Sequence, residues 1–69
     1  MKVRYDPDAD ALYIEIVATT VVTKRLDQDI AIDYDAEGHI AGIEILSAGE
    51  RVFGKDNRRL VRLENVEAA

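Results

Sequence analysis

Two segments of the chain are alike, and this likeness constrains the fold more than any other feature. Residues 6–16 read DPDADALYIEI and residues 33–45 read DYDAEGHIAGIEI. In each, an acidic stretch of turn-forming residues stands before a short apolar strand that ends in Ile-Glu-Ile. Asp, Pro and Gly favour tight turns, and alternating β-branched residues favour strands. The two segments therefore predict two β-turns, each followed by a strand, but they are too short to establish an internal duplication.

The alternation of polar and apolar residues predicts five strands. They are expected over residues 2–5, 11–17, 21–26, 30–34 and 39–46. Lys24 and Arg25 favour an edge position for the third strand, because charged side chains there discourage unwanted pairing. Gly42 interrupts the alternation of the last strand, which predicts a β-bulge at or near it. The alternative is a strand that buries residues on both faces.

Beyond Leu46 the pattern is weaker. Ser47 and Glu50 have the spacing of a capping box, which predicts a short helix over residues 48–53. Residues 59–66 fit a final strand or one face of a helix, so residues 47–66 are left open between helix and strand. The predicted fold is α+β, mainly an antiparallel β-meander of four to five strands with one short C-terminal helix. It forms a single small β-rich domain over residues 1–69.

The chain is short for a stable monomer. A domain of about 60 residues buries only about 60% of its unfolded surface, so small folds usually need reinforcement. The sequence has no cysteine and a single histidine, His39, which excludes disulfides and thiolate metal sites. We therefore expect a homo-oligomer, with a dimer favoured, and the alternative is a well-packed monomer.

Composition and charge disfavour a disordered protein, a membrane protein and a nucleic-acid-binding protein. Hydrophobic residues make up 48% of the chain, too many for a disordered protein, and no apolar stretch approaches the about 20 residues of a membrane helix. The first ten residues lack the apolar core of a signal peptide, so we expect a cytoplasmic protein without membrane contact. The formal net charge is -5, and residues 1–46 carry most of the acidic side chains, which makes nucleic acid an unlikely partner.

The same motifs carry a resemblance to a known family. DPDADALYIEI, together with LDQDIAIDYDAEGHIAGIEILSA, resembles the short prokaryotic proteins grouped as domain of unknown function 2283, over about residues 2–48. The resemblance implies no activity, cofactor or catalytic residue. Similar genes are sometimes found beside genes for toxin-like proteins, which implies a small protein partner. The following segment, SAGERVFGKDNRR, departs from the helix-forming, lysine- and leucine-rich continuation of similar proteins.

The acidic turns are the weak candidates for a metal site. The first turn spaces its carboxylates as the opening of an EF-hand loop does, but Ala11 and Val17 stand where that loop needs glycine and glutamate. Solvated turns are the simpler interpretation, and a site would gain support if the two turns met in space. The candidate residues are Asp6, Asp8, Asp10, Asp33, Asp35 and Glu37.

Other groups favour ordinary structural roles. Glu15 and Glu44 are expected on the solvent face of the sheet, and His39 on the surface. The three tyrosines, Tyr5, Tyr13 and Tyr34, are expected to pack in the core and at sheet edges rather than form a binding patch. A basic cluster is expected to be solvated surface first, and a contact for acidic partners or the protein's own acidic turns second; its members are Arg51, Lys55, Arg58, Arg59 and Arg62.

These observations lead to three hypotheses. The first is a non-enzymatic interaction module, in which exposed sheet edges pair with another copy or with a small protein partner. The second is a metal- or small-ligand-binding protein that uses its acidic turns. The third is a small hydrolase assembled across subunits from the same carboxylates, and it is the least favoured because no activated nucleophile or oxyanion donor accompanies them.

Overall fold

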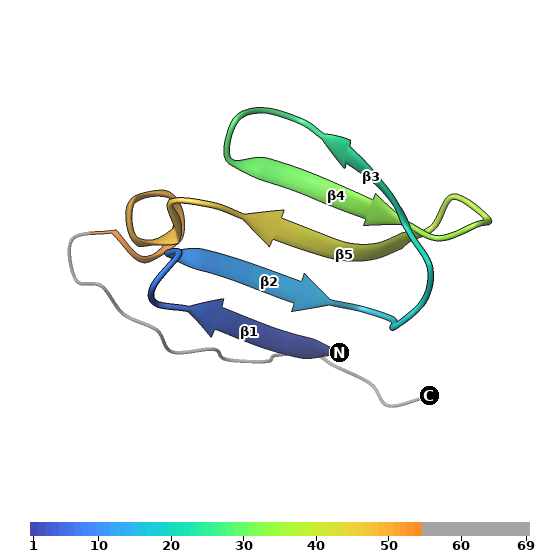
Figure 1. Ribbon diagram of the computed structural model, residues 1–69, viewed down its shortest axis with the longest axis horizontal. Coiled ribbons are helices and arrows are strands. Elements are labelled where there is room, and N and C mark those ends of the chain that lie inside the picture. The colour runs from blue at the N-terminus through green and yellow to red at the C-terminus, as the bar shows by residue number, and fades with distance from the viewer. Residues whose placement is uncertain (55–69) are drawn as a thin grey trace.

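A computed structural model of the protein describes residues 1–54, and they form one antiparallel β-sheet followed by a single helical turn (Figure 1). The strands are β1 (Lys2–Asp6), β2 (Ala11–Glu15), β3 (Val22–Arg25), β4 (Ile30–Tyr34) and β5 (Ile40–Ile45), and the turn is the π-helix η1 (Gly49–Phe53). All five strands lie where the alternation predicts them. The predicted α+β class is only loosely supported, because one short turn is the whole helical content of residues 1–54. The open prediction for residues 59–66 lies outside the described residues.

The order of the strands is not that of a meander. The sheet runs β1-β2-β5-β4-β3, so β5 lies between β2 and β4, and residues 16–21 cross the end of the sheet to reach β3. Strands β2 to β5 thus form a Greek key with its long connection first. The physical reason lies in the side chains. This order places the apolar strands β2, β5 and β4 together, and it leaves β3 with Lys24 and Arg25 at the edge, as predicted.

Residues paired across strands share a face, so the register sorts the side chains into two faces. One, here called the apolar face, carries three rows that run across the strands. The end row at η1 contains Tyr5, Leu12, Ile45 and Ile30; the middle row Val3, Ile14, Ile43, Ile32 and Lys24; the far row Ile40, Tyr34 and Val22. The opposite face, here called the polar face, carries Arg4, Tyr13, Glu15, Glu44, Asp33, Thr23 and Arg25.

The predicted bulge lies next to Gly42. Asp33 pairs with Gly42 whereas Tyr34 pairs with Ile40, so Ala41 is the extra residue on β5. On its other side, the Ala41 carbonyl accepts hydrogen bonds from the backbone N–H groups of Ile16, at 2.8 Å, and Val17, at 3.1 Å. Ala41 is fully buried. The bulge restores the alternation, so that Ile40 and Ile43 both lie on the apolar face.

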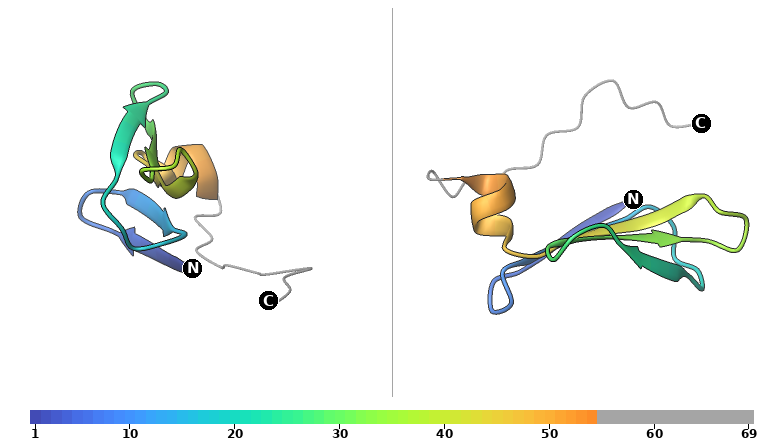
Figure 2. Two further views of the ribbon diagram at one scale, coloured as in Figure 1. Left: turned by 90° about the vertical axis from the view of Figure 1, so that its right-hand side faces the viewer. Right: turned by 90° about the horizontal axis from the view of Figure 1, so that it is seen from above.

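The η1 turn lies on the apolar side of the sheet, at the end where β1 meets β2 (Figure 2). The ring of Phe53 packs edge-on against Tyr5, with 5.4 Å between ring centroids. The predicted helix is present, but the predicted cap is wrong. Ser47 has a positive φ of 53°, and the Asp10 carboxylate instead accepts a hydrogen bond from the Gly49 backbone N–H, at 2.9 Å. A carboxylate from the β1–β2 turn therefore caps a helical turn 39 residues away.

Little of the chain is deeply buried. The buried apolar residues among residues 1–54 are Leu12, Ala31, Ala41 and Ala48, and none of the larger described side chains is fully enclosed. No helix within this part of the chain is long and apolar enough to cross a membrane. The single sheet layer thus has one polar face and one apolar face, and η1 packs against only one end of the latter.

Candidate functional site

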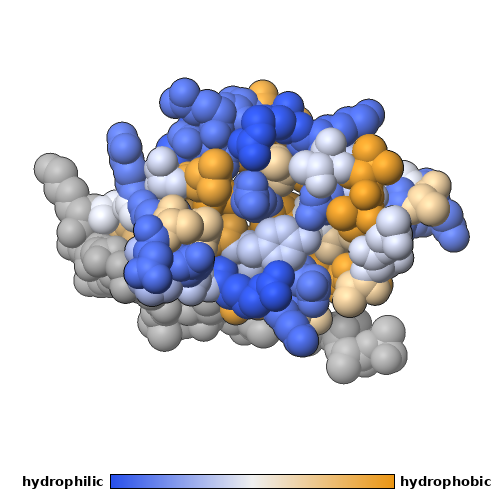
Figure 3. All heavy atoms as spheres, in the orientation of Figure 1, coloured by the Kyte–Doolittle hydropathy of each residue, from blue (hydrophilic) through white to orange (hydrophobic). Residues whose placement is uncertain are grey.

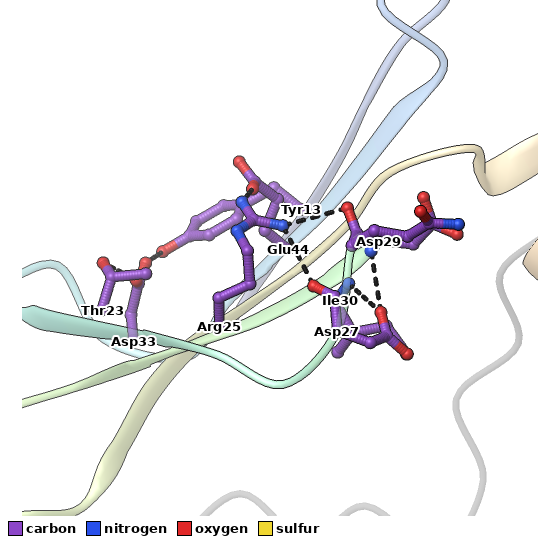
Figure 4. Close-up of polar contacts among 9 residues, drawn as sticks. Tyr13, Thr23, Arg25, Asp27, Asp29, Ile30, Asp33 and Glu44 are labelled. Carbon is purple, nitrogen blue, oxygen red and sulfur yellow. Dashed lines mark hydrogen bonds and ion pairs between the residues drawn. The ribbon is translucent and has the colours of Figure 1, made fainter.

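The polar face is held by a chain of side chains that crosses all five strands. Arg4 of β1 places its guanidinium carbon 5.2 Å from the centroid of the Tyr13 ring on β2. The Tyr13 hydroxyl reaches across β5 and donates a hydrogen bond to the Asp33 carboxylate on β4, at 2.6 Å. Thr23 of the edge strand β3 donates to the other oxygen of Asp33 (Figure 4). We call these four residues the Tyr13 network.

Glycine at position 42 is what allows Tyr13 to cross β5. A β-carbon at Gly42 would overlap the phenol oxygen of Tyr13 and lie within 3.3 Å of the Ile14 carbonyl oxygen. The tyrosine ring thus occupies the space that a side chain would take, and covers backbone that glycine leaves bare. The hydrogen bond to Asp33, followed by burial, raises the pKa of Tyr13 from 10.0 to about 12. At neutral pH the Tyr13 hydroxyl is therefore protonated and donates its hydrogen bond to Asp33.

The two strand glutamates lie on the polar face, as predicted. Glu44 forms an ion pair with Arg25 at 3.3 Å, and both side chains are more than 40% exposed. Exposed pairs of this kind typically contribute about 0–1 kcal/mol. Hydrophilic side chains spread across this face in Figure 3, which looks onto the side of the sheet away from η1. The polar face is thus a solvated surface whose long side chains contact one another.

The first acidic turn uses its carboxylates to build the loop. Asp6 accepts hydrogen bonds from the backbone N–H groups of Asp8, at 3.0 Å, and Ala9, at 3.4 Å. Asp10 has a φ of 51° and accepts from both the Tyr5 hydroxyl, at 2.7 Å, and the Gly49 N–H. Asp8 is exposed. Asp6 and Asp10 therefore accept hydrogen bonds from different parts of the chain, while Asp8 is exposed to solvent.

The second acidic turn follows the same principle. Asp35 accepts hydrogen bonds from the backbone N–H groups of His39 and Glu37, both at 2.9 Å. These bonds, the one from His39 foremost, lower the pKa of Asp35 below its ordinary value of 3.8. Glu37 is exposed, 3.8 Å from the imidazole of His39, and Gly38 has the positive φ that its turn position predicts. Asp33 belongs to the Tyr13 network instead.

The two acidic turns do not meet within one chain. They lie at opposite ends of the sheet, the first beside η1 and the second at the β4–β5 hairpin (Figure 1). Within residues 1–54, no group of three or more acidic, histidine or cysteine side chains is arranged to hold a metal ion. Metal binding through Asp6, Asp8, Asp10, Asp33, Asp35 and Glu37 stays a prediction, and one chain does not gather the six residues.

A third acidic turn escaped the sequence analysis. The Asp27 carboxylate accepts hydrogen bonds from the Asp29 and Ile30 N–H groups, and these bonds, with Arg51 nearby, lower its pKa below 3.8. Arg51 of η1 forms ion pairs with Asp29, at 3.0 Å, and with Asp27, at 3.5 Å. The sequence LDQDI has the same Asp-x-Asp spacing as the other turns, which was the available signal. Arg51 thus contacts the protein's own acidic turn, and the other members of the predicted basic cluster lie outside the described residues.

The apolar face is the large surface that described side chains leave open. Val22 is 64% exposed, Ile40 42% and Val3 39%, and all three lie away from η1. The tyrosines divide between the faces, because Tyr5 and Tyr34 lie on the apolar face and Tyr13 on the polar face. They therefore form no common aromatic patch. An open row of aliphatic side chains can hold another apolar surface, and it offers no group for acid–base chemistry.

Comparisons with known proteins agree with the resemblance in the motifs. No curated protein and no solved structure matches the chain. A family model does match, over residues 2–48, which include all five strands and end just before η1. The match covers well over half of the 69 residues, so the chain belongs to the family described as protein of unknown function (DUF2283).

Proposed function

We propose that the protein is a non-enzymatic interaction module that works by binding other protein chains, itself included. The observation that carries the proposal is the contrast between the two faces of the sheet. On the polar face the long side chains contact one another, whereas on the apolar face Val22 and Ile40 stay exposed beyond the reach of η1. Exposed apolar patches bordered by polar residues commonly mark protein interaction sites.

The energetics support the same conclusion. Burying a Val, Leu or Ile side chain is worth about 1.5–3 kcal/mol relative to leaving it exposed, so covering even part of the far row matters to a chain of this size. A domain of 69 residues has a small free energy of unfolding, because it buries a smaller fraction of its surface than a larger domain does. A chain that binds only the folded state raises its stability by mass action. We therefore propose a homodimer as the basic assembly.

The finer role that we propose is that of the partner-binding, antitoxin-like member of a two-protein system. Its support is the resemblance to proteins whose genes are sometimes found beside genes for small toxin-like proteins. The turn carboxylates support a binding role over a catalytic one, because Asp6, Asp10 and Asp35 already accept hydrogen bonds that shape their loops. Loops built in this way use their carboxylates as hydrogen-bond acceptors for the backbone.

The test is native co-purification. The full chain, tagged and expressed in its own host, is isolated at physiological salt beside an Ile40→Lys variant of the apolar face and a Thr23→Lys control on the polar face. We expect one small protein in stoichiometric amount with the wild type and the Thr23→Lys control. We expect its loss with Ile40→Lys, because we propose that the partner binds the homodimer, which needs the far row of the apolar face. Recovery of the wild type with no stoichiometric companion would contradict the antitoxin-like role.

A further inference from the structure

We infer that the apolar face is covered by the apolar face of a second copy of this chain, so that two sheets pack face to face. The inference rests on the proposed function and names the surface that forms the homodimer. It differs from pairing through sheet edges, which the sequence pattern alone suggests. Three features of the described residues favour the face over the edges: the charges of the edge strands, the composition of the face, and its size.

The edge strand β3 disfavours pairing with a second copy, whether through β3 or through β1. The charged residues of β3 are Lys24 and Arg25, and β1 carries Lys2 and Arg4 before Asp6 at its end. Pairing β3 with β3 or β1 with β3 therefore brings basic side chains into proximity, and like charges directly opposite are destabilising. Lysine on an edge strand is a common means of preventing edge-to-edge association. The β3 edge is therefore protected against a second copy, whereas the apolar face is not.

The apolar face is compatible with itself. Its middle and far rows contain one charged residue, Lys24, which lies at the β3 margin with its ammonium 5.7 Å from the centroid of the Tyr34 ring. Two copies related by a two-fold axis bring together aliphatic rows, and the lysine stem can remain at the rim with its ammonium in water. A foreign partner would be selected by charges or hydrogen-bonding groups, and the centre of this face has neither. A copy of the same chain satisfies both faces at once.

The size of the face matches a weak dimer. Five strands about 4.8 Å apart, each about five residues long at about 3.4 Å per residue, give a face of about 24 by 17 Å. Each copy thus contributes at most about 400 Å² in projection, and two copies at most about 800 Å², less the row that η1 covers and before the relief of the side chains is added. Specific interfaces begin at about 1,000 Å² in total, so we expect a concentration-dependent dimer. Facing sheets pack about 10 Å apart, which leaves room for one interdigitated layer of side chains.

The position of η1 defines where the two copies meet. Its Phe53 covers Tyr5 in the row nearest to it, whereas the exposed aliphatic residues lie in the other two rows. The contact therefore centres on the middle and far rows. Val22 is the best residue for a test, because it lies on the apolar face and is 64% exposed in the single chain. A charge introduced there leaves the folding of one chain nearly unchanged but has to be desolvated in a face-to-face dimer.

The experiment compares the full-length wild type with Val22→Lys and Thr23→Lys by sedimentation equilibrium. The two substitutions add the same charge at neighbouring positions of β3 but on opposite faces, and Lys at position 23 lies beside the Asp33 carboxylate. We expect the Val22→Lys dissociation constant to rise at least tenfold while that of Thr23→Lys stays within about twofold of the wild type, because a desolvated charge costs more than 1.4 kcal/mol. Far-ultraviolet circular dichroism checks that each variant is folded. If Val22→Lys does not fold, Ile40→Lys replaces it as the apolar-face variant.

Two outcomes would overturn the inference, and they are distinguishable. A dimer weakened equally, or not at all, by the two substitutions would place the interface elsewhere and leave the proposed homodimer standing. A wild type that is monomeric at every concentration up to about 200 µM, well above the Kd of a specific weak complex, would reject both the face-to-face dimer and the homodimer. The face would then be assigned to residues 55–69 of the same chain or to a foreign partner.

Discussion

Tyr13 and Gly42 form a lock between neighbouring strands, in which the tyrosine ring of β2 fills the place that a side chain on β5 would take. The ring is held there by its hydrogen bond to Asp33, one strand further on. A small residue and a large one thus fix the register of three strands together. Several measurable consequences follow from this lock and from the acidic turns.

Gly42→Ala is expected to destabilise the protein by about 1–3 kcal/mol, the usual range for overpacking. The new methyl group overlaps the Tyr13 phenol, so the ring has to leave its place. In a Tyr13→Ala background the same substitution should cost clearly less, because the overlapping ring is gone and only the close contact with the Ile14 carbonyl oxygen remains. Urea unfolding of the four proteins of this double-mutant cycle gives the coupling free energy. Equal effects of Gly42→Ala in both backgrounds would show that the lock is absent.

Tyr13 is expected to titrate well above the ordinary pKa of a tyrosine. Its folded pKa of about 12 lies above the ordinary 10.0, so the hydrogen bond to Asp33 stabilises the fold fully below pH 10. This stabilisation is lost as the pH rises from 10 toward 12. Ultraviolet titration at the phenolate band should show a late component in the wild type that disappears in Tyr13→Phe. At neutral pH, Tyr13→Phe should lower the free energy of unfolding by about 1 kcal/mol, the usual net value of one hydrogen bond.

Asp10 is expected to be the most sensitive of the acidic turn residues. Asp10→Ala removes the acceptor for Tyr5 and for Gly49, and it places a residue poorly suited to positive φ at 51°. We expect a loss of about 2 kcal/mol, from one or two hydrogen bonds and the backbone strain. Asp10→Asn retains a hydrogen-bond acceptor, and asparagine adopts positive φ readily, so this variant should lose less than half as much free energy of unfolding as Asp10→Ala. A larger loss for Asn than for Ala would contradict this account of the turn.

Asp35 is expected to make the protein sensitive to acid. Its pKa is lowered in the folded state by the N–H groups of His39 and Glu37, so its contribution is present above the ordinary value of 3.8. That contribution is lost as the pH falls through the lower, folded pKa. Asp35→Asn, which still accepts hydrogen bonds but does not titrate, should therefore show a weaker decline in stability below pH 4. Unfolding by urea between pH 5 and pH 2 measures the difference, and Asp8→Asn is the exposed control.

The local features of the fold could be predicted from particular residues. Gly38 and Pro7 mark turns, and the break at Gly42 correctly predicts the bulge. The strand order could not be read in the same way, because pairing of β2 with β5 is decided by long-range packing of Leu12 and Ile14 against Ile45 and Ile43. The predicted meander is therefore wrong. The edge position predicted for β3 was already inconsistent with a five-stranded meander, in which the third strand is central.

The candidate site shows the same division between local and distant contacts. Asp6 and Asp35 accept hydrogen bonds from backbone N–H groups within their own turns, a local pattern that is common for turn aspartates. Asp10 and Asp33 find partners 39 and 20 residues away, on Gly49 and Tyr13, and no spacing within a turn indicates this. The cap predicted at Ser47 is wrong for the same reason, since Asp10 arrives there through the fold. The open apolar face likewise emerges only when the register of all five strands is known.

The most direct test of the central claim, that this sheet is completed by a second chain, is the mass of the full-length wild type measured by light scattering over a concentration series. The chain mass is 7.7 kDa. We expect the weight-average mass to rise with concentration toward twice that value and to level off there, as it does for a closed dimer of two apolar faces. A mass that stays at 7.7 kDa from the lowest to the highest concentration would contradict the account.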